Sequence, residues 1–267
     1  MGTQNAIRCA GWHLFFGKQP EWPVWRHGGV PGCAVTEGFM SALPPLSARL
    51  RLAASFVRSG VTVADIGTDH AYLPVWLVCS GHNPSALACD VRSGPLARAA
   101  QTVAQYGVQE QVVLRQTDGL AGVQAQDIVI AGMGGELIAA ILSRSEWVRR
   151  PDVRLILQPM TAQETLRAWL CREGFVIDRE DAAMEGDKHY LVMCVRYGGV
   201  PFEPDAFFCF AGRLPETGSR AGRDYLCWQA RRLRKKADGL ARSAARAAQA
   251  ETWSALAARL ERAAEQI

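Results

Sequence analysis

The sequence predicts an α/β fold with a mostly parallel sheet that ends in a β-hairpin, followed by a pair of helices. Between residues 46 and 174, short apolar stretches alternate with stretches whose apolar residues recur at helical spacing. Two longer stretches, Phe175–Ala183 and His189–Tyr197, follow in succession and predict two antiparallel strands. After a proline-containing linker, residues 201–215, the composition changes to alanine and arginine. These observations define a sheet domain of residues 40–200 and a separate helical segment behind it.

Most of the predicted strands lead directly into a predicted helix. Strands are expected at residues 61–66, 86–90, 111–116, 127–131 and 153–158. Helices are expected at residues 46–57, 72–80, 95–107, 137–143 and 161–174. The last helix begins with Thr161-Ala-Gln-Glu164, the pattern of a capping box in which both side chains bond to free amide groups of the helix. Strands that alternate with helices form mostly parallel sheets, so these five strands are expected to run parallel and to be joined by right-handed crossovers.

The C-terminal segment, residues 216–267, predicts two packed helices with a basic face. Apolar residues repeat at heptad spacing, first at Leu226, Ala230, Leu233, Ala237 and Leu240 and then at Trp253, Leu256, Leu260, Ala263 and Ile267. Off the first seam lie Arg231, Arg232, Arg234, Lys235 and Lys236. The chain has a net charge of +4, of which residues 213–267 contribute +6 and the rest −2. Such a concentration favours an RNA-binding domain, although solvated helix faces show the same pattern.

Composition narrows the class of protein. The 267 residues are 49% hydrophobic and 21% charged, which is typical of soluble globular proteins, and no apolar stretch is long enough to span a membrane. Eight cysteines form no CxxC pair and no zinc-like spacing, so we expect reduced thiols, a cytoplasmic location and no metal site. Residues 1–39 have no secretory signal and no periodicity, and Met40 opens a segment that resembles an ordinary start. We expect residues 1–39 to be disordered or to precede the true translation start.

Three carboxylates follow three successive predicted strands. Asp65 lies at the end of the first strand beside Gly67, Asp90 ends the second, and Asp118-Gly119 follows the third. The carboxyl ends of parallel strands are where α/β sheets bind ligands, and a glycine there lets the backbone turn sharply and approach a ligand. An ammonium group, ribose hydroxyls and an adenine amine would suit these three acceptors. Each aspartate alone is also ordinary turn chemistry.

A glycine cluster, Ala131-Gly-Met-Gly-Gly135, follows the fourth predicted strand. A dinucleotide fold would place GxGxxG after the first strand, where it is absent, and no Walker A lysine is present. Backbone exposed by Gly132, Gly134 and Gly135 would leave room for a planar base beside a bound cofactor. The alternative is that these glycines only start a helix.

In combination, several motifs resemble the bacterial tRNA (adenine-22-N1)-methyltransferase family. They are Leu46-Ser-Ala-Arg-Leu50, Asp65-Ile-Gly-Thr-Asp-His-Ala-Tyr-Leu-Pro74, Ala131-Gly-Met-Gly-Gly135, Leu155-Ile-Leu-Gln-Pro159 and Leu166-Arg-Ala-Trp-Leu170. The resemblance covers residues 46–199 closely, and the basic helical C-terminus in architecture. It implies a class I, Rossmann-like methyltransferase fold, S-adenosyl-L-methionine as the cofactor, and transfer of its methyl group to N1 of an adenine in the D-arm of tRNA.

The resemblance also implies roles for individual residues. The cofactor site would be lined by Arg49, Asp65, Gly67, His70, Asp90, Asp118, Gly119 and Gly132. The target base would be faced by Asp69, His70, Tyr72, Gln158 and Pro159, the first three of them as candidate catalytic residues. Arg231, Arg232 and Lys235 would contact tRNA phosphates. Two positions depart from the family pattern: Asp90, where many members have glutamate, and Leu191, where an acidic residue is common.

The expected chemistry needs alignment more than proton transfer. Adenine N1 has a free lone pair in the plane of the ring, so its attack on a methyl group requires no prior deprotonation. N1 lies on the Watson–Crick edge, so the base must be unpaired and extruded, and Tyr72 could stack on it. Two alternatives stay open, a methyltransferase acting on another RNA base and a non-catalytic RNA-binding protein that keeps the fold. Nothing in the sequence indicates an obligatory protein partner.

Overall fold

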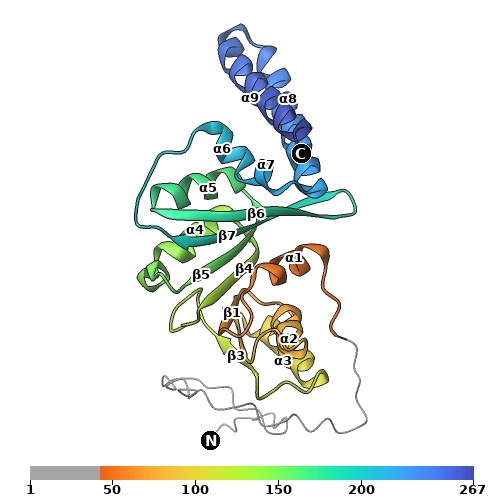
Figure 1. The fold of residues 1–267 in the computed structure, drawn as a ribbon, viewed down its shortest axis with the longest axis vertical. Helices are drawn as coiled ribbons and strands as arrows, with labels where there is room; N and C mark the ends of the chain where they lie inside the picture. Colours follow the sequence, from red (N-terminus) through yellow and green to blue (C-terminus); the bar gives the residue numbers. More distant parts are fainter. Residues whose placement is uncertain (1–42) are drawn as a thin grey trace, which may run out of the picture. The chain divides into compact units, whose positions relative to one another are not determined.

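The computed structural model describes residues 43–267 and contains one seven-stranded sheet (Figure 1). Its strands are β1 (Val63–Ile66), β2 (Ala86–Asp90), β3 (Val112–Gln116), β4 (Asp127–Gly134), β5 (Arg154–Thr161), β6 (Phe175–Glu185) and β7 (Lys188–Tyr197). The helices beside the sheet are α1 (Ala48–Phe56), α2 (Tyr72–Cys79), α3 (Ser93–Gln105), α4 (Gly135–Ser143) and α5 (Gln163–Arg172), with a 3₁₀ turn η1 (Glu146–Arg149). The C-terminal part contains α6 (Ala206–Ala211), α7 (Leu214–Thr217), α8 (Arg220–Ala241), η2 (Ala244–Arg246) and α9 (Ala247–Glu265).

The strand order is β3-β2-β1-β4-β5-β7-β6, which confirms the predicted fold class. Strands β1 to β5 pair in parallel, whereas β7 runs antiparallel to β5 and pairs with β6 as a hairpin. The order reverses direction between β1 and β4, so their carboxyl ends form the switch point where α/β sheets bind ligands. Right-handed crossovers then place α2 and α3 on one face of the sheet and α4 on the other (Figure 1).

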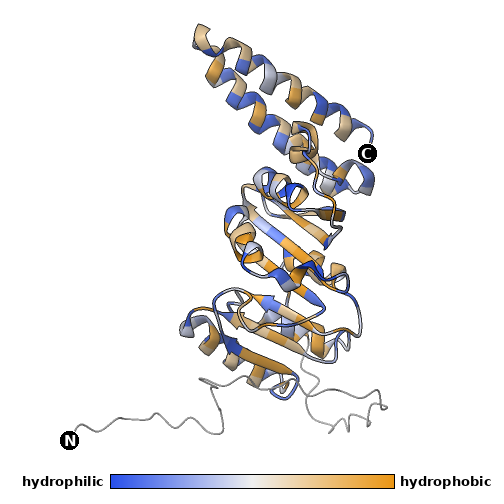
Figure 2. Cartoon of the chain, turned by 90° about the vertical axis from the view of Figure 1, so that its left-hand side faces the viewer, coloured by the Kyte–Doolittle hydropathy of each residue, from blue (hydrophilic) through white to orange (hydrophobic). Residues whose placement is uncertain are grey.

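The core lies between the sheet and its helices. One buried cluster joins Phe56 of α1 and Leu77 of α2 to Ile156 of β5, and a second joins Val75 of α2 to Val103 of α3. Figure 2 shows hydrophobic residues concentrated along the strands and hydrophilic ones on the outer helix faces. The four residues of β1 and all five of β2 are buried, as expected for central strands covered on both faces. The strand ends that carry the candidate site therefore belong to buried, closely packed strands.

The capping box predicted at Thr161 is absent. Strand β4 continues through Gly134, which pairs with Thr161, so β5 is extended through the residue that was to cap the helix. Ala162 instead precedes α5 in the left-handed conformation (φ 53°), without a side-chain cap. Sheet pairing thus took precedence over the local capping signal.

The segment predicted as a linker, residues 201–215, folds instead. Asp205 caps α6 by accepting a hydrogen bond from the Phe208 amide at 2.7 Å, and Phe210 and Leu214 are buried. The carbonyl oxygens of Cys209 and Phe210 accept hydrogen bonds from the Arg167 guanidinium, which also pairs with Glu180 in the core. Because this ion pair is fully buried, it fixes α6 to α5 and β6.

The C-terminal helices α8 and α9 form the predicted hairpin (Figure 1). Their seams are buried at Leu226, Ala230, Leu233, Leu256 and Leu260. Two basic residues of α8 turn toward α9, since Arg234 pairs with Glu261 and Lys236 lies 3.7 Å from the Trp253 ring centroid. In residues 43–267 no helix is long and apolar enough to cross a membrane. The prediction for residues 1–39 lies outside the described part of the chain.

Candidate active site

The loop after β1 is the centre of the candidate site. The amides of Gly67 and Thr68 both donate to the carbonyl oxygen of Cys89 at 2.8 Å, which ties this loop to the neighbouring strand β2. Gly67 has a φ of 82°, a conformation that side chains disfavour, and a Cβ there would meet the end of the Met133 side chain. Thr68 Oγ1 accepts from the Ala71 amide at 3.1 Å and closes the turn into α2. The chain therefore bends sharply here, and its backbone, without a side chain at Gly67, is open to a ligand at the switch point.

Asp65 is a buried carboxylate at this point, with 9% of its surface exposed. Burial raises its pKa from the ordinary value of 3.8 to about 6, against the opposing effects of a Thr68 hydrogen bond and the positive charge of Arg49. Asp90 lies close enough to raise this pKa slightly further. Asp65 forms no salt bridge in residues 43–267, so its charge has no direct partner within the described structure.

The other two carboxylates have different surroundings. Asp90 is also buried, and it accepts a hydrogen bond from the Arg92 amide at 2.8 Å, which orients it at the end of β2. Asp118 is largely exposed and forms two hydrogen bonds with the Arg144 guanidinium, at 2.9 and 3.2 Å. Gly119, beside it, has a φ of 57° and lies against Ile141. All three aspartates lie at carboxyl ends of neighbouring strands, as predicted, but only Asp118 is held by an ion pair from outside its loop.

A buried glutamine joins two residues that the sequence assigned to the cofactor. Gln158 Oε1 accepts from Arg49 Nη1 and from the Gly132 amide, both at 3.0 Å. The Gln158 side chain is fully buried, and Pro159 is buried as well. Gln158 therefore holds Arg49 of α1 against the glycine segment of β4. Gln158 itself lies beneath the surface, so it does not face solvent where the target base was expected. Gly132 has a φ of 81° at a β-bulge between β4 and β5.

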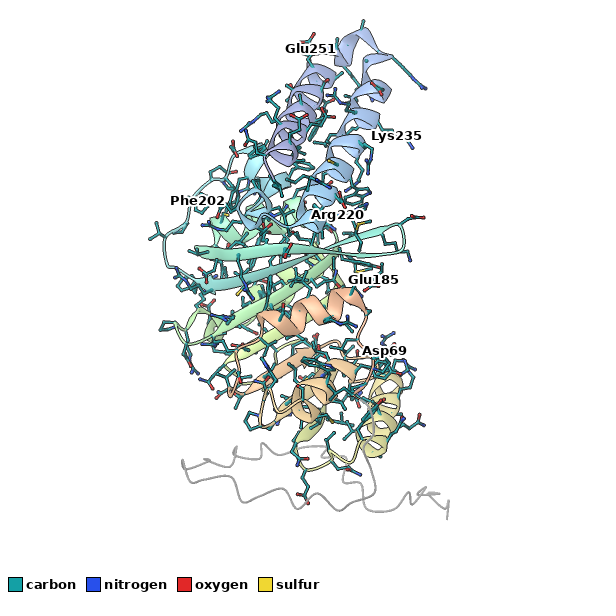
Figure 3. The ribbon with its side chains drawn as sticks, turned by 45° about the vertical axis from the view of Figure 1, so that its right-hand side comes forward. Asp69, Glu185, Phe202, Arg220, Lys235 and Glu251 are labelled. Carbon is teal, nitrogen blue, oxygen red and sulfur yellow. The ribbon has the colours of Figure 1, made fainter. Side chains whose placement is uncertain are left out.

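Asp69, His70 and Tyr72 form the exposed rim of the site. The His70 and Tyr72 rings stack with centroids 5.3 Å apart and planes 8° apart. Asp69, labelled in Figure 3, pairs with Arg98 of α3, whose guanidinium lowers the pKa of this carboxyl. It also lies 3.5 Å from His70 Nε2. Tyr72 is 39% exposed, so its ring is accessible at the carboxyl edge. The three candidate catalytic residues are brought together.

Some residues of the site were not predicted. The Arg49 amide donates to Glu185 Oε1 at 2.8 Å, so the tip of the β6–β7 hairpin reaches the start of α1. The Arg49 guanidinium lies 5.9 Å from the Tyr190 ring centroid of β7. Arg144 was missed as well. These contacts join segments far apart in the sequence, so no local pattern predicts them.

The predicted tRNA contacts lie on α8. Arg231, Arg232 and Lys235 are exposed and take part in no salt bridge within residues 43–267. Arg232 lies 4.7 Å from the Trp228 ring centroid, and Lys235 projects outward (Figure 3). Arg234 and Lys236 instead contact α9, through the ion pair with Glu261 and the Trp253 ring. The helix therefore offers three unpaired cations on one exposed surface.

Comparison with known proteins identifies the family. A family model for a methyltransferase domain matches residues 46–193. A tRNA (adenine(22)-N(1))-methyltransferase of Bacillus subtilis is 36% identical over 172 residues, which are 63% of this chain and 72% of that protein. The chain belongs to the tRNA (adenine(22)-N1)-methyltransferase family. The resemblance stated from the motifs is confirmed.

Solved structures of this methyltransferase family have the same fold. A candidate tRNA (m1A22) methyltransferase of Streptococcus pneumoniae, in complex with S-adenosyl-L-methionine, is 34% identical with a TM-score of 0.70, covering 81% of this chain and 100% of that one. The m1A22 tRNA methyltransferase TrmK of B. subtilis is 28% identical with a TM-score of 0.69, covering 84% and 98%. In both comparisons nearly the whole of the solved chain is covered.

Proposed function

We propose that this protein transfers a methyl group from S-adenosyl-L-methionine to N1 of adenine 22 of tRNA. The observation that carries the proposal is Asp65, which is buried at the switch point without an ion-pair partner in residues 43–267, in a chain belonging to this methyltransferase family. A carboxylate with a pKa raised to about 6 by burial gains most from a cationic ligand, because an ammonium group restores the favourable environment that burial removed. Asp65 therefore suits the ammonium group at the amino-acid end of the cofactor.

The remaining cofactor contacts follow the strand ends. Asp90, fixed by the Arg92 amide, is the acceptor for ribose hydroxyls, and Asp118 with Gly119 lies where the adenine of the cofactor would sit. Gly67 and Gly132 keep backbone close to the ligand, and both have a positive φ. His70 and Arg49 would border the amino-acid end. The sulfonium of the cofactor supplies an electrophilic methyl group.

The target adenine would lie against the rim formed by Asp69, His70 and Tyr72. The exposed Tyr72 ring stacks on the base, and Asp69 or His70 accepts from its exocyclic amine. No residue has to remove a proton, because the N1 lone pair is free, so the rim acts by aligning N1 with the methyl group. Gln158 contributes by holding Arg49 and Gly132, and the buried Pro159 completes this wall.

The helical hairpin would provide affinity for the rest of the tRNA. The exposed cations Arg231, Arg232 and Lys235 suit phosphate contacts, whose strength falls as salt rises. Replacing Arg231 and Arg232 by glutamate should weaken tRNA binding and reduce its salt dependence by about two ions, while leaving cofactor affinity unchanged. Equal loss of both affinities would contradict this division. We expect the protein to act on tRNA in the cytoplasm.

The decisive experiment is methylation of defined tRNAs. The protein is incubated with isotopically labelled S-adenosyl-L-methionine and unmodified tRNA transcripts, and the product nucleosides are identified by mass spectrometry. We expect 1-methyladenosine in a transcript with adenine at position 22 and none when that adenine is replaced by guanine. Label in another nucleoside would indicate a different target base. Cofactor and tRNA binding without any methylated nucleoside would indicate a non-catalytic RNA-binding protein.

A further inference from the structure

A pocket outside the candidate active site lies between the tip of the β6–β7 hairpin and α8. It is an open surface pocket with a volume of about 400 Å³. Asp187 and His189 of the hairpin line one side, and Asp224, Trp228 and Arg231 of α8 line the other. None of these residues except Arg231 has a role in the proposed methyl transfer.

Two stacked rings line this pocket. The His189 and Trp228 rings have centroids 5.3 Å apart and planes 27° apart. Burial lowers the pKa of His189, and the charge of Arg231 acts in the same direction, outweighing the two aspartates, so the imidazole is neutral at pH 7. The exposed Arg232 guanidinium lies 4.7 Å from the Trp228 ring centroid, and His189 is stacked on the same ring, so a base can stack on Trp228 only by displacing Arg232. A flat aromatic ligand suits this environment.

The charged groups select which part of a nucleotide would enter. Asp187 and Asp224 place two carboxylates in the pocket, and carboxylates accept hydrogen bonds from the amino groups of a base. Asp224 also lies 3.8 Å from Arg220 Nε and 3.7 Å from Arg223 Nε. The exposed Arg231 is the only cation among the lining residues of the described structure, and it suits the phosphate of the same nucleotide. The pocket therefore matches an unpaired nucleotide that carries an amino group on its base.

The hairpin also separates this pocket from the candidate active site. Successive residues of a strand point to opposite faces, and on β7 His189 turns toward Trp228 while Tyr190 lies beneath Arg49. At the tip, Glu185 binds the Arg49 amide. In Figure 3, Glu185 lies between Asp69, at the rim, and Lys235, on α8. An RNA strand that crosses the hairpin tip can thus place one base on each side of it.

We propose that the pocket takes a second unpaired nucleotide of the tRNA while the target adenine occupies the rim at Asp69 to Tyr72. This inference rests on the proposed function. The base of the second nucleotide displaces the Arg232 guanidinium and stacks on Trp228 beside His189, its amino group donates to Asp187 or Asp224, and its phosphate pairs with Arg231. The hairpin tip then lies between the two extruded bases and fixes the register of the tRNA on the enzyme.

The test combines protein variants with tRNAs that lack single bases. Trp228→Ala should weaken tRNA binding about 10-fold, as loss of one stacked base does, whereas Trp228→Phe, which keeps a ring, should retain most of the affinity. Transcripts with one abasic nucleotide at each D-arm position are then measured with the wild type and Trp228→Ala. At one position other than 22, the abasic change should weaken wild-type binding and have no further effect in Trp228→Ala, because the two changes remove the same contact.

Trp147→Ala is the matched control. Trp147 lies in η1, which directly precedes β5 and so lies at the amino end of that strand, away from the hairpin tip. This change should therefore leave tRNA affinity unaltered. Cofactor affinity and the urea midpoint are measured for each variant. Unchanged values show that a loss of tRNA affinity comes from a lost contact and not from a disturbed fold. Wild-type affinity in Trp228→Ala, or additive losses at every abasic position, would overturn the inference. If the wild type methylates adenine 22, such results leave the proposed function standing; if it methylates no tRNA, that function itself fails.

A second measurement uses the wild-type protein alone. Cys227 lines the pocket and is partly exposed, whereas Cys79 is exposed at the end of α2, at the far edge of the sheet. Bound tRNA should slow alkylation of Cys227 by N-ethylmaleimide, followed by peptide mass spectrometry, and leave Cys79 unchanged. S-adenosyl-L-methionine alone should protect neither. Undiminished alkylation of Cys227 in the tRNA complex would overturn the inference even if Trp228→Ala does not fold.

Discussion

Replacing Asp65 by asparagine should stabilise the protein while weakening its affinity for the cofactor. Burial raises the Asp65 pKa from 3.8 to about 6, so the folded state holds the proton more tightly than the unfolded state does. Folding stability contributed by this group is therefore highest at low pH, falls as pH rises between about 4 and 6, and stays reduced above that range. The cost at pH 8 is about 3 kcal/mol. Asparagine keeps the shape of the side chain and carries no charge to bury.

The assay is urea unfolding of the cofactor-free protein at two pH values. At pH 8 we expect Asp65→Asn to raise the free energy of unfolding by up to about 3 kcal/mol, and at pH 5 by about half as much, because the wild-type carboxyl is then mostly protonated. Calorimetric titration of S-adenosyl-L-methionine should show affinity reduced at least about 30-fold, since the variant cannot pair with an ammonium group. Cofactor affinity of the wild type should also fall below pH 6.

The matched control is Asp127→Asn at the opposite edge of the sheet. Asp127 is fully buried and accepts hydrogen bonds from the Arg58 amide, Nε and Nη2, at 2.6, 2.8 and 2.5 Å. Its charge is paired, so the same substitution should destabilise the fold by about 1–3 kcal/mol. An Asp65→Asn protein no more stable than the wild type at pH 8, or a gain that does not change with pH, would refute the reasoning from burial.

Three further predictions concern stability and are measured by urea unfolding. Glu180→Gln should cost about 3–5 kcal/mol, because it leaves the Arg167 guanidinium charged, fully buried and without its counterion; a loss below about 1 kcal/mol would contradict this. Gly135→Ala should cost about 1–3 kcal/mol, since its Cβ would lie 2.5 Å from the Ala162 carbonyl oxygen, and an unchanged midpoint would show that the strand ends yield easily. Gly239→Ala, in α8 with open space around it, should instead stabilise by about 0.5–1 kcal/mol, and a loss would mean that the helix needs a glycine there.

Much of the fold could be read from local patterns. The parallel strands lie within a few residues of the predicted ranges, because central strands covered on both faces must be apolar throughout. The helical hairpin was also predicted, since heptad spacing leaves one seam to bury. Where prediction failed, at the linker and the capping box, the deciding contacts were distant. Arg167 of α5 organises residues 201–215, and Gly134 of β4 extends β5 through Thr161.

The site divides in the same way. The sequence by itself determined which residue types stand at the strand ends, since Asp65, Asp90 and Asp118 follow apolar stretches whose parallel pairing must bring their ends together. Only the tertiary structure decided what surrounds each of them. It buried Asp65 without an ion-pair partner in residues 43–267, paired Asp118 with Arg144, and brought the hairpin tip against Arg49. These environments depend on segments that local sequence cannot place. The chemistry of a carboxylate is set by its type, whereas its pKa and its availability are set by what packs around it.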